Sequence, residues 1–422
     1  MEYQQDLLIN GDGGEIFPFL RHIKLSGTNF EIGKQLAEIN IANHGDTLEK
    51  HRVPDPVYAR ARREYFQNHY PIYWERMQGV AAALGADPHD DHYDFSAMWH
   101  NVDLPPRPGC SNAFYPPTHT ATGHTYLSRN YEFSTGPFAE VVGMALDSAT
   151  RAQMKAMMGE PYIMEWQPTD GGYASWTVHV NDVLGGAFDG INSAGLAVAL
   201  MADEEAMGQL YEPQGGFVQA IGVGELQIVR LLLDTCATVE EAKQTLLTIK
   251  QYYTYVPCHY MIADVSGNSF IYENSTGRNR SIIVDGGGNP QACTNHHVYN
   301  QEINDVPELT LQTNSQWRYA TLQNRITAQE QYTVDDMRDN SASVGVKHLV
   351  SEMLKSPDFL SVAANVNSRT LWYTLYDLTE LAIEVDFYLN SHVSEDGEYH
   401  EERSQIFKFK VSTSEAISGP GR

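Results

Sequence analysis

The sequence has few positive charges for its length. Its 422 residues include 28 lysines and arginines against 54 aspartates and glutamates, which leaves a formal net charge of −26 at pH 7. Nucleic acids and anionic membrane surfaces would repel such a chain. The composition therefore argues against nucleic acid as a partner and favours a protein that acts on small molecules.

Cysteines are also scarce. The chain has four, widely spaced and without a CxxC pair: Cys110, Cys236, Cys258 and Cys293. Neither a disulfide framework nor a zinc site is predicted from that spacing. "DPHDDHYD" (87–94) follows a predicted helix end, so we interpret it as a polar loop between helices. The adjacent histidines of "TNHHVYN" (294–300) would face opposite ways on a strand. We predict free thiols, no metal and no cofactor.

Long apolar runs are absent. The longest, "AGLAVALMA" from Ala194 to Ala202, is about half of the roughly 18 residues that a membrane helix needs. The first residues, "MEYQQDLLINGDGGE", lack the basic start and apolar block of a signal peptide. We expect a cytoplasmic protein without a membrane span.

The chain does contain enough apolar material for a large core, with 42% hydrophobic and 11% aromatic residues. From about Asn29 to Trp99, apolar residues recur at spacings of three and four, which predicts helices. After Cys110, short β-rich runs separated by Gly, Asn and Asp predict strands. The predicted strand runs are 124–133, 173–182, 195–202, 259–274, 280–286 and 370–389. Helical patterns at 216–251 and 313–331 lie between them, so we predict an α+β protein with helices layered on sheets.

One cysteine stands in an unusual context. "NVDLPPRPGCSNAFYPP" (101–117) holds five prolines and places Cys110 directly after Gly109. It is either a linker with an incidental thiol or a site that holds backbone and thiol in a fixed relation. The following residues, "GCSNAFYPPTHTATGHTYLSRNYEF", predict a β-hairpin that returns Arg129 and Glu132 to the neighbourhood of Cys110. A nearby cation favours a reactive thiolate, and a carboxylate can position an amine.

With these residues the sequence resembles the cysteine N-terminal nucleophile (Ntn) amidohydrolases, the group of isopenicillin N acyltransferase, penicillin V acylase and bile salt hydrolase. The similarity is greatest to the acyltransferase branch, in which a glycine precedes the cysteine. The matching blocks, in order, are "RNYE" (129–132), "DGINSAGLAVAL" (189–200), "LLDTCATVEEA" (232–242), "HYMIADVSGNSFIYE" (259–273), "ACTNHH" (292–297) and "SQWRYATL" (315–322). The resemblance implies a four-layer αββα fold with a helical N-terminal pro-segment.

The resemblance also implies that the precursor cuts itself. The Cys110 sulfur would attack the carbonyl of Gly109, and water would hydrolyse the resulting thioester. Cleavage would free the α-amino group of Cys110, whose ordinary pKa of about 7.7 suits a general base near neutral pH. Residues 1–109 would then form a small subunit and residues 110–422 the catalytic segment. The prolines at 105, 106 and 108 would present Gly109 to the thiol.

Further roles follow from the resemblance. Arg129 would favour the thiolate and orient the substrate carbonyl. Glu132 stands where the family usually has aspartate, whose carboxylate binds the new α-amine. Asn295 would donate a hydrogen bond to the oxyanion of the tetrahedral intermediate. Arg318 matches a late arginine of the family's active-site cluster. Ala202 falls where the bile salt hydrolase branch has a second oxyanion asparagine, so that donor is missing.

Simpler interpretations remain open at this point. Arg129 would fit a solvated strand end, Asn295 a turn, and Arg318 a salt bridge within its helix. Asn192 and Gly195 are interpreted as turn residues.

The predicted activity is hydrolysis of a linear amide bond through a Cys110 thioester, with transfer of a hydrophobic acyl group as a variant. Asn130 and Tyr131 are predicted to touch substrate. An acyltransferase that uses acyl-coenzyme A is the alternative, and a catalytically silent binding protein is the second alternative. The expected partners are a small-molecule N-acyl substrate and the chain's own cleaved N-terminal segment. The sequence leaves homo-oligomer formation open.

Overall fold

The computed structural model is an α+β protein built on two large β-sheets. It describes residues 3–13, 17–100, 109–137, 147, 150, 154, 156, 158–203, 220–254, 256–275, 280–299, 305–310, 313–354, 368–396 and 398–411. The prolines at 105, 106 and 108 lie outside these residues. Among the residues described, no helix has the length and apolar character to cross a membrane.

The larger sheet has nine strands in the order β1-β2-β5-β6-β7-β8-β11-β12-β13. Their bounds are β1 Gln4–Gly13, β2 Phe17–Gly27, β5 Tyr162–Pro168, β6 Ser175–His179, β7 Ala187–Asn192, β8 Leu196–Ala202, β11 Cys258–Asp264, β12 Ser269–Ser275 and β13 Arg280–Asp285. The strands β6, β7, β8 and β11 are buried along their whole length. Both faces of the sheet centre are therefore covered.

The smaller sheet has seven strands in the order β14-β3-β4-β15-β16-β17, with β18 also paired to β16. Their bounds are β3 Gly109–Tyr115, β4 Tyr126–Ser134, β14 Gln291–Cys293, β15 Ser368–Asp377, β16 Ala382–Val393, β17 Tyr399–Arg403 and β18 Phe407–Lys410. The short strands β9 Val223–Gly224 and β10 Gln251–Tyr252 pair separately. The predicted hairpin from Cys110 is confirmed as β3 and β4.

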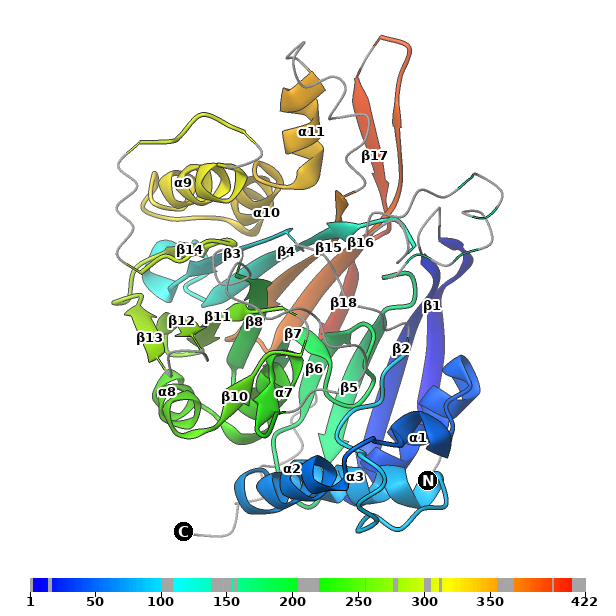
Figure 1. The fold of residues 1–422 in the computed structure, drawn as a ribbon. Coiled ribbons are helices and arrows are strands. Elements are labelled where there is room, and N and C mark those ends of the chain that lie inside the picture. The colour runs from blue at the N-terminus through cyan, green and yellow to red at the C-terminus, as the bar shows by residue number, and fades with distance from the viewer. Residues whose placement is uncertain are drawn as a thin grey trace.

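Helices cover the outer face of each sheet, which makes four layers (Figure 1). The bounds are α1 Asn29–His44, η1 Leu48–His51, α2 Pro56–His69, α3 Pro71–Ala83, η2 Pro117–His119, α7 Glu225–Thr235, α8 Val239–Thr248, α9 Asn314–Ile326, α10 Val334–Ala342 and α11 Val346–Leu354. Helices α9 and α10 lie on the seven-stranded sheet, and α1, α7 and α8 lie on the nine-stranded sheet. The αββα arrangement is confirmed.

The N-terminal segment is only partly helical. Helices α1 to α3 lie in the region where helices were predicted, but β1 and β2 precede them and were not expected. β2 pairs in parallel with β5, so residues before Cys110 extend the sheet that residues after it build. Parallel pairing between such distant segments leaves no local signal in the sequence, because no turn connects the two strands.

The two largest apolar clusters follow the layers. The larger fills the space around the nine-stranded sheet and includes Cys110, Tyr131 and Phe188. The smaller lies between the seven-stranded sheet and α9 and α10, and includes Tyr115 and Leu322. The hairpin β3–β4 contributes to both clusters, so each of its faces is buried. Polar groups on either face must therefore find partners within the protein.

Candidate active site

The cysteine of the predicted hairpin lies at the start of β3, opposite Tyr131 of β4. Residues opposite each other in an antiparallel pair project to the same side, and neighbours along a strand project to opposite sides. The hairpin therefore divides its polar residues between two faces. We call the side with Cys110, Arg129 and Tyr131 the thiol face, which looks toward the nine-stranded sheet. The side with Asn130 and Glu132 is the helix face, which looks toward α9 and α10.

The Cys110 thiol is fully buried on the thiol face. Arg129 donates from Nη2 to the sulfur at 3.6 Å and to the carbonyl oxygen of Leu200 at 2.8 Å. Burial raises the pKa of the Cys110 thiol, and the Arg129 guanidinium opposes that rise. Arg129 thus lies where a cysteine nucleophile needs a cation. The alternative of a solvated strand end is wrong, because Arg129 has no exposed surface.

An aspartate without a predicted role holds Arg129 in place. Asp189 of β7 forms an ion pair with Arg129, and both side chains are fully buried. Its other oxygen accepts hydrogen bonds from the hydroxyls of Thr374, at 2.8 Å, and Tyr376, at 2.7 Å. The guanidinium is therefore fixed from two sheets at once. The only sequence signal for Asp189 was its place at the head of the "DGINSAG" block.

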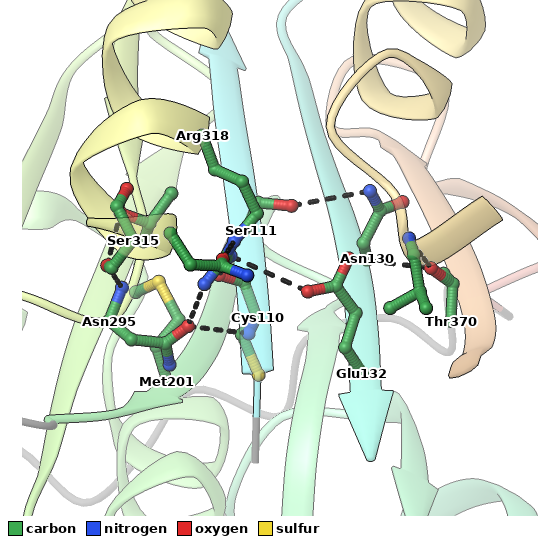
Figure 2. Close-up of polar contacts among 12 residues, drawn as sticks. Cys110, Ser111, Asn130, Glu132, Met201, Asn295, Ser315, Arg318 and Thr370 are labelled. Atoms are coloured by element: carbon green, nitrogen blue, oxygen red, sulfur yellow. Dashed lines mark hydrogen bonds and ion pairs between the residues drawn. The ribbon is translucent and has the colours of Figure 1, made fainter. Parts of the chain in front are cut away.

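On the helix face, Arg318 reaches the site from α9 (Figure 2). Its Nη1 donates to the carbonyl oxygen of Cys110, and its Nη2 donates to Asn295 Oδ1 at 2.7 Å. Nη1 also lies 3.5 Å from Glu132 Oε2. The alternative of a salt bridge within the helix is wrong, because the charged partner belongs to β4. Arg318 instead binds the backbone of the cysteine.

Asn295 connects Cys110 to strand β8 of the nine-stranded sheet. Its Oδ1 accepts hydrogen bonds from the Cys110 N–H, at 2.8 Å, and from Arg318, while its Nδ2 donates to the carbonyl oxygen of Ala202 at 2.8 Å. A backbone N–H and a guanidinium can only donate, and a carbonyl oxygen can only accept. These partners settle which end of the amide faces Cys110. Asn295 holds the cysteine nitrogen in this geometry, and its role as an oxyanion donor stays a prediction.

Glu132 lies on the helix face beside Gly109. A Cβ atom at position 109 would come within 2.9 Å of Glu132 Oε2. Thr370 donates to the other carboxylate oxygen at 3.4 Å. Burial raises the pKa of Glu132 to about 7, and the Arg318 guanidinium acts in the opposite direction. A carboxyl group with such a pKa can exchange a proton near neutral pH.

The two residues predicted to touch substrate lie on different faces. Tyr131 stacks on Trp372, with ring centroids 3.9 Å apart, on the thiol face. Asn130 points to the helix face (Figure 2), where it donates to the carbonyl oxygen of Ser341 in α10 at 2.8 Å. The Asn130 side chain thus ties the sheet to its helix layer. Only Tyr131 shares the thiol's surroundings.

The turn interpretation of Asn192 and Gly195 is confirmed. Asn192 Oδ1 accepts hydrogen bonds from the N–H groups of Ala194, at 3.1 Å, and Leu196, at 3.0 Å, between β7 and β8. Gly195 has a φ of 84°, in the left-handed region that glycine tolerates best.

The segments with metal-capable residues have protein partners. In the aspartate-rich loop, Asp91 forms ion pairs with Arg60 and Arg63. His297 pairs with Asp203. In the part of the chain that the structure describes, no group of three or more His, Cys, Asp and Glu residues is arranged to hold a metal. All four cysteines are free thiols, as predicted.

Comparison with known proteins matches the chain to a family. The family model described as acyl-coenzyme A:6-aminopenicillanic acid acyl-transferase matches residues 152–384. No curated protein matches the sequence. Among solved structures, penicillin V acylase from Agrobacterium tumefaciens is 18% identical, with a TM-score of 0.41 over 66% of this chain and 83% of that chain. A mutant of conjugated bile acid hydrolase from Clostridium perfringens is 14% identical, with a TM-score of 0.36 over 72% of this chain and 97% of that chain.

Proposed function

The chain belongs to the acyl-coenzyme A:6-aminopenicillanic acid acyl-transferase family, whose model spans more than half of it, and we propose that Cys110 first cuts its own chain and then hydrolyses a linear amide bond of an N-acyl substrate. One observation carries this proposal. The sulfur, nitrogen and carbonyl oxygen of Cys110 are held by three different side chains, those of Arg129, Asn295 and Arg318. Such fixed geometry favours attack by a thiol on a nearby carbonyl.

The self-cleavage step uses the bond between Gly109 and Cys110. The sulfur attacks the Gly109 carbonyl carbon, the C–N bond breaks, and the thiol proton passes to the departing nitrogen. Water then hydrolyses the thioester, which leaves a carboxylate on Gly109 and a free thiol and α-amino group on Cys110. Glu132 lies against Gly109, and its pKa is raised to about 7, which supports a role for its carboxylate as the proton acceptor at this bond.

Cleavage would also open the site. In the uncut chain the Cys110 side chain has no exposed surface, so a substrate cannot reach it. The cut would give Gly109 a carboxylate beside that of Glu132. Two carboxylates in contact cannot both stay ionised at low cost, so the new chain end is expected to leave and expose the thiol.

In turnover, the thiol attacks the substrate carbonyl and the α-amino group of Cys110 accepts the thiol proton. That proton passes to the departing amine, and water releases the acyl group from the thioester. Asn295 accepts a hydrogen bond from the Cys110 nitrogen at 2.8 Å in the uncut chain, a contact that the freed amine can keep. The acyl group is expected to be hydrophobic, since the thiol face is lined by Tyr131, Phe188 and Trp372.

Residues 1–109 are expected to remain bound after the cut. Arg76 of α3 and Asp234 of α7 form an ion pair with no exposed surface, and Tyr70 also donates to Asp234. The pairing of β2 with β5 adds a second link between the two segments. Their separation would expose buried charges and a sheet edge.

Mass spectrometry of the purified protein tests the proposal. For the wild-type protein we expect two fragments that co-purify in native gel filtration, the second of which begins at Cys110. For Cys110→Ala we expect a single uncut chain. A panel of N-acyl amides with different acyl chains should then show release of the acid. An intact wild-type chain that resists a cysteine-directed acyl probe would instead make the protein a silent binding member of its family.

Acyl transfer is the second candidate, since the family is described by a reaction of acyl-coenzyme A with an amine. Both reactions pass through the same Cys110 thioester and differ in whether water or an amine accepts the acyl group. Incubation with an acyl-coenzyme A and an amine, followed by analysis for amide product, separates the two.

A further inference from the structure

One amide on the thiol face is buried almost without partners. Asn112 lies two residues after Cys110 on β3 and has no exposed surface. Within the described part of the chain, its Nδ2 donates only to the sulfur of Met201, at 3.2 Å, and its Oδ1 has no hydrogen-bond partner. A primary amide can form four hydrogen bonds, and a thioether sulfur is a weak acceptor. A buried amide in this state lowers stability, so its presence needs a reason.

Another buried asparagine provides a contrast. Asn192, which also has no exposed surface, donates from Nδ2 to the carbonyl oxygens of Leu233, at 3.0 Å, and Cys236, at 2.7 Å. Its Oδ1 accepts hydrogen bonds from two N–H groups between β7 and β8. The Asn192 amide thus holds a turn and the end of α7. The Asn112 amide contacts no backbone group among the described residues, so it has no comparable structural task.

The Asn112 amide lies beside the nucleophile. Side chains two residues apart on a strand project to the same face, with Cα atoms about 6.6 Å apart. Asn112 therefore shares the thiol face with Cys110. It lies directly opposite Arg129 on β4, and Arg129 donates to the Cys110 sulfur at 3.6 Å. The thiol, the guanidinium and the amide are thus neighbours on one face of the hairpin.

Three side chains around Cys110 each contact one of three consecutive residues of β8. The contacts are Arg129 to Leu200, Asn112 to Met201 and Asn295 to Ala202. The first and third of these side chains also bind Cys110 itself, at its sulfur and its nitrogen. The Met201 contact lies between theirs along β8, which places the Asn112 amide close to the reacting atoms.

Attack by the thiol on an amide creates a negative charge among these groups. The Cys110 sulfur forms a bond to the substrate carbonyl carbon, and an electron pair of the C=O bond moves onto the oxygen. When the C–N bond breaks, that pair returns, and the amine leaves with the proton that the α-amino group took from the thiol. Fixed donors near the oxygen stabilise the intermediate most when they need no rearrangement of strong hydrogen bonds.

We propose that Asn112 donates to this oxyanion, in the place that the Met201 sulfur occupies in the uncut chain. The inference rests on the proposed function and makes Asn112 a catalytic residue. Methionine side chains change conformation easily, so the sulfur yields to the substrate's carbonyl oxygen once cleavage has opened the site. Because the exchange replaces a weak acceptor by an anion, the hydrogen bond is strongest in the transition state.

Asn112→Leu removes the donor and keeps a side chain of similar shape. With the best amide of the panel above, and with rates expressed per titrated Cys110 thiol of the cut protein, kcat should fall about a hundredfold. KM should change less than about threefold, because the donor acts mainly in the transition state. An aldehyde with the same acyl chain adds to the thiol and places an oxygen at the oxyanion position, so its affinity should fall at least about thirtyfold.

A stability measurement separates this role from a structural one. In the uncut Cys110→Ala background, Asn112→Leu should leave the urea midpoint unchanged or raise it, because an apolar group replaces an unsatisfied buried amide. Asn192→Leu is the matched control. It should lower the midpoint, because it leaves two carbonyl oxygens and two N–H groups without their partner.

Hydrolysis by Asn112→Leu at the wild-type rate would overturn the inference, and so would a decrease in its urea midpoint as large as that of Asn192→Leu. If Asn112→Leu does not cut itself, the midpoint alone decides, because self-cleavage passes through an oxyanion at the same sulfur. A wild-type protein that hydrolyses no amide of the panel would count against the proposed function instead. The two failures are therefore distinguishable.

Discussion

Glu132 lies so close to Gly109 that a Cβ atom at position 109 would come within 2.9 Å of its Oε2 atom and 3.2 Å of its Cβ atom. The residue before the nucleophile is thus kept small by a side chain from the neighbouring strand. This contact gives glycine at position 109 a steric reason, in addition to its backbone freedom.

Gly109→Ala is expected to slow self-cleavage about tenfold, because overpacking of this size costs roughly 1–3 kcal/mol and would displace the Glu132 carboxylate. The precursor fraction on denaturing gels after pulse labelling measures the effect. Ser111→Ala, a small change in the same strand, serves as the control. Self-cleavage of Gly109→Ala at the wild-type rate would show that the Glu132 side chain moves away from position 109 without a free-energy cost.

The pKa of Glu132 predicts how the uncut protein responds to pH. The pKa is raised from 4.5 to about 7 in the folded chain, so between these values the folded state keeps a proton that the unfolded state has released. Stability conferred by that proton is therefore lost as the pH rises toward 7. In a Cys110→Ala background, the free energy of unfolding should fall by up to about 3 kcal/mol between pH 5 and pH 8, at 1.4 kcal/mol per pKa unit.

Urea unfolding at the two pH values measures this change. Glu132→Gln in the same background should reduce the fall, because glutamine does not titrate. The same pH dependence with and without Glu132 would assign the effect to other groups.

Arg318→Lys separates the charge of Arg318 from its shape. Lysine keeps a cation near Glu132 but cannot donate in a fork to both the Cys110 carbonyl and Asn295. We expect cleavage and kcat to fall at least tenfold, by roughly 1.4 kcal/mol or more. Arg325→Lys, an exposed position in the same helix, is the matched control. Full activity in Arg318→Lys would mean that charge alone is enough.

Asp189→Asn should destabilise the uncut Cys110→Ala protein by about 3–5 kcal/mol, because Arg129 would remain buried without its counter-charge. The double change Arg129→Met/Asp189→Asn should recover part of this stability, since the unpaired charge is gone. Made in chains that keep Cys110, neither variant should be active, because the cation next to the thiol is displaced or lost. Thermal unfolding and amide hydrolysis measure the two effects, and equal stability losses in both variants would argue against the pairing.

Much of the fold could be predicted from local patterns. Short β-rich runs bounded by Gly, Asn and Asp marked β4, β8, β11 and β15, and spacings of three and four marked the helices of the N-terminal segment. Helices α10 and α11 and the strands β1 and β2 were missed. Strand β1 and helix α10 are mostly polar, which leaves little periodic signal. Helix α11 and the end of β2 do carry apolar residues at helix and strand spacing, respectively, but both elements lie outside the segments for which helices and strands were predicted.

The sequence by itself determined the members of the candidate site. Gly109, Cys110, Arg129 and Glu132 were named from the context of the cysteine and the hairpin that follows it, and Asn295 and Arg318 only from the family resemblance. The structure brings all six together. Only the tertiary structure decided how they are divided: the thiol and Arg129 on one face of the hairpin, and Glu132 and Arg318 on the other. It alone joined Arg129 to Asp189 and Asn295 to Ala202. Such contacts depend on the register of the strands and on how the two sheets pack. Both join residues that are far apart along the chain, so no local sequence pattern specifies them.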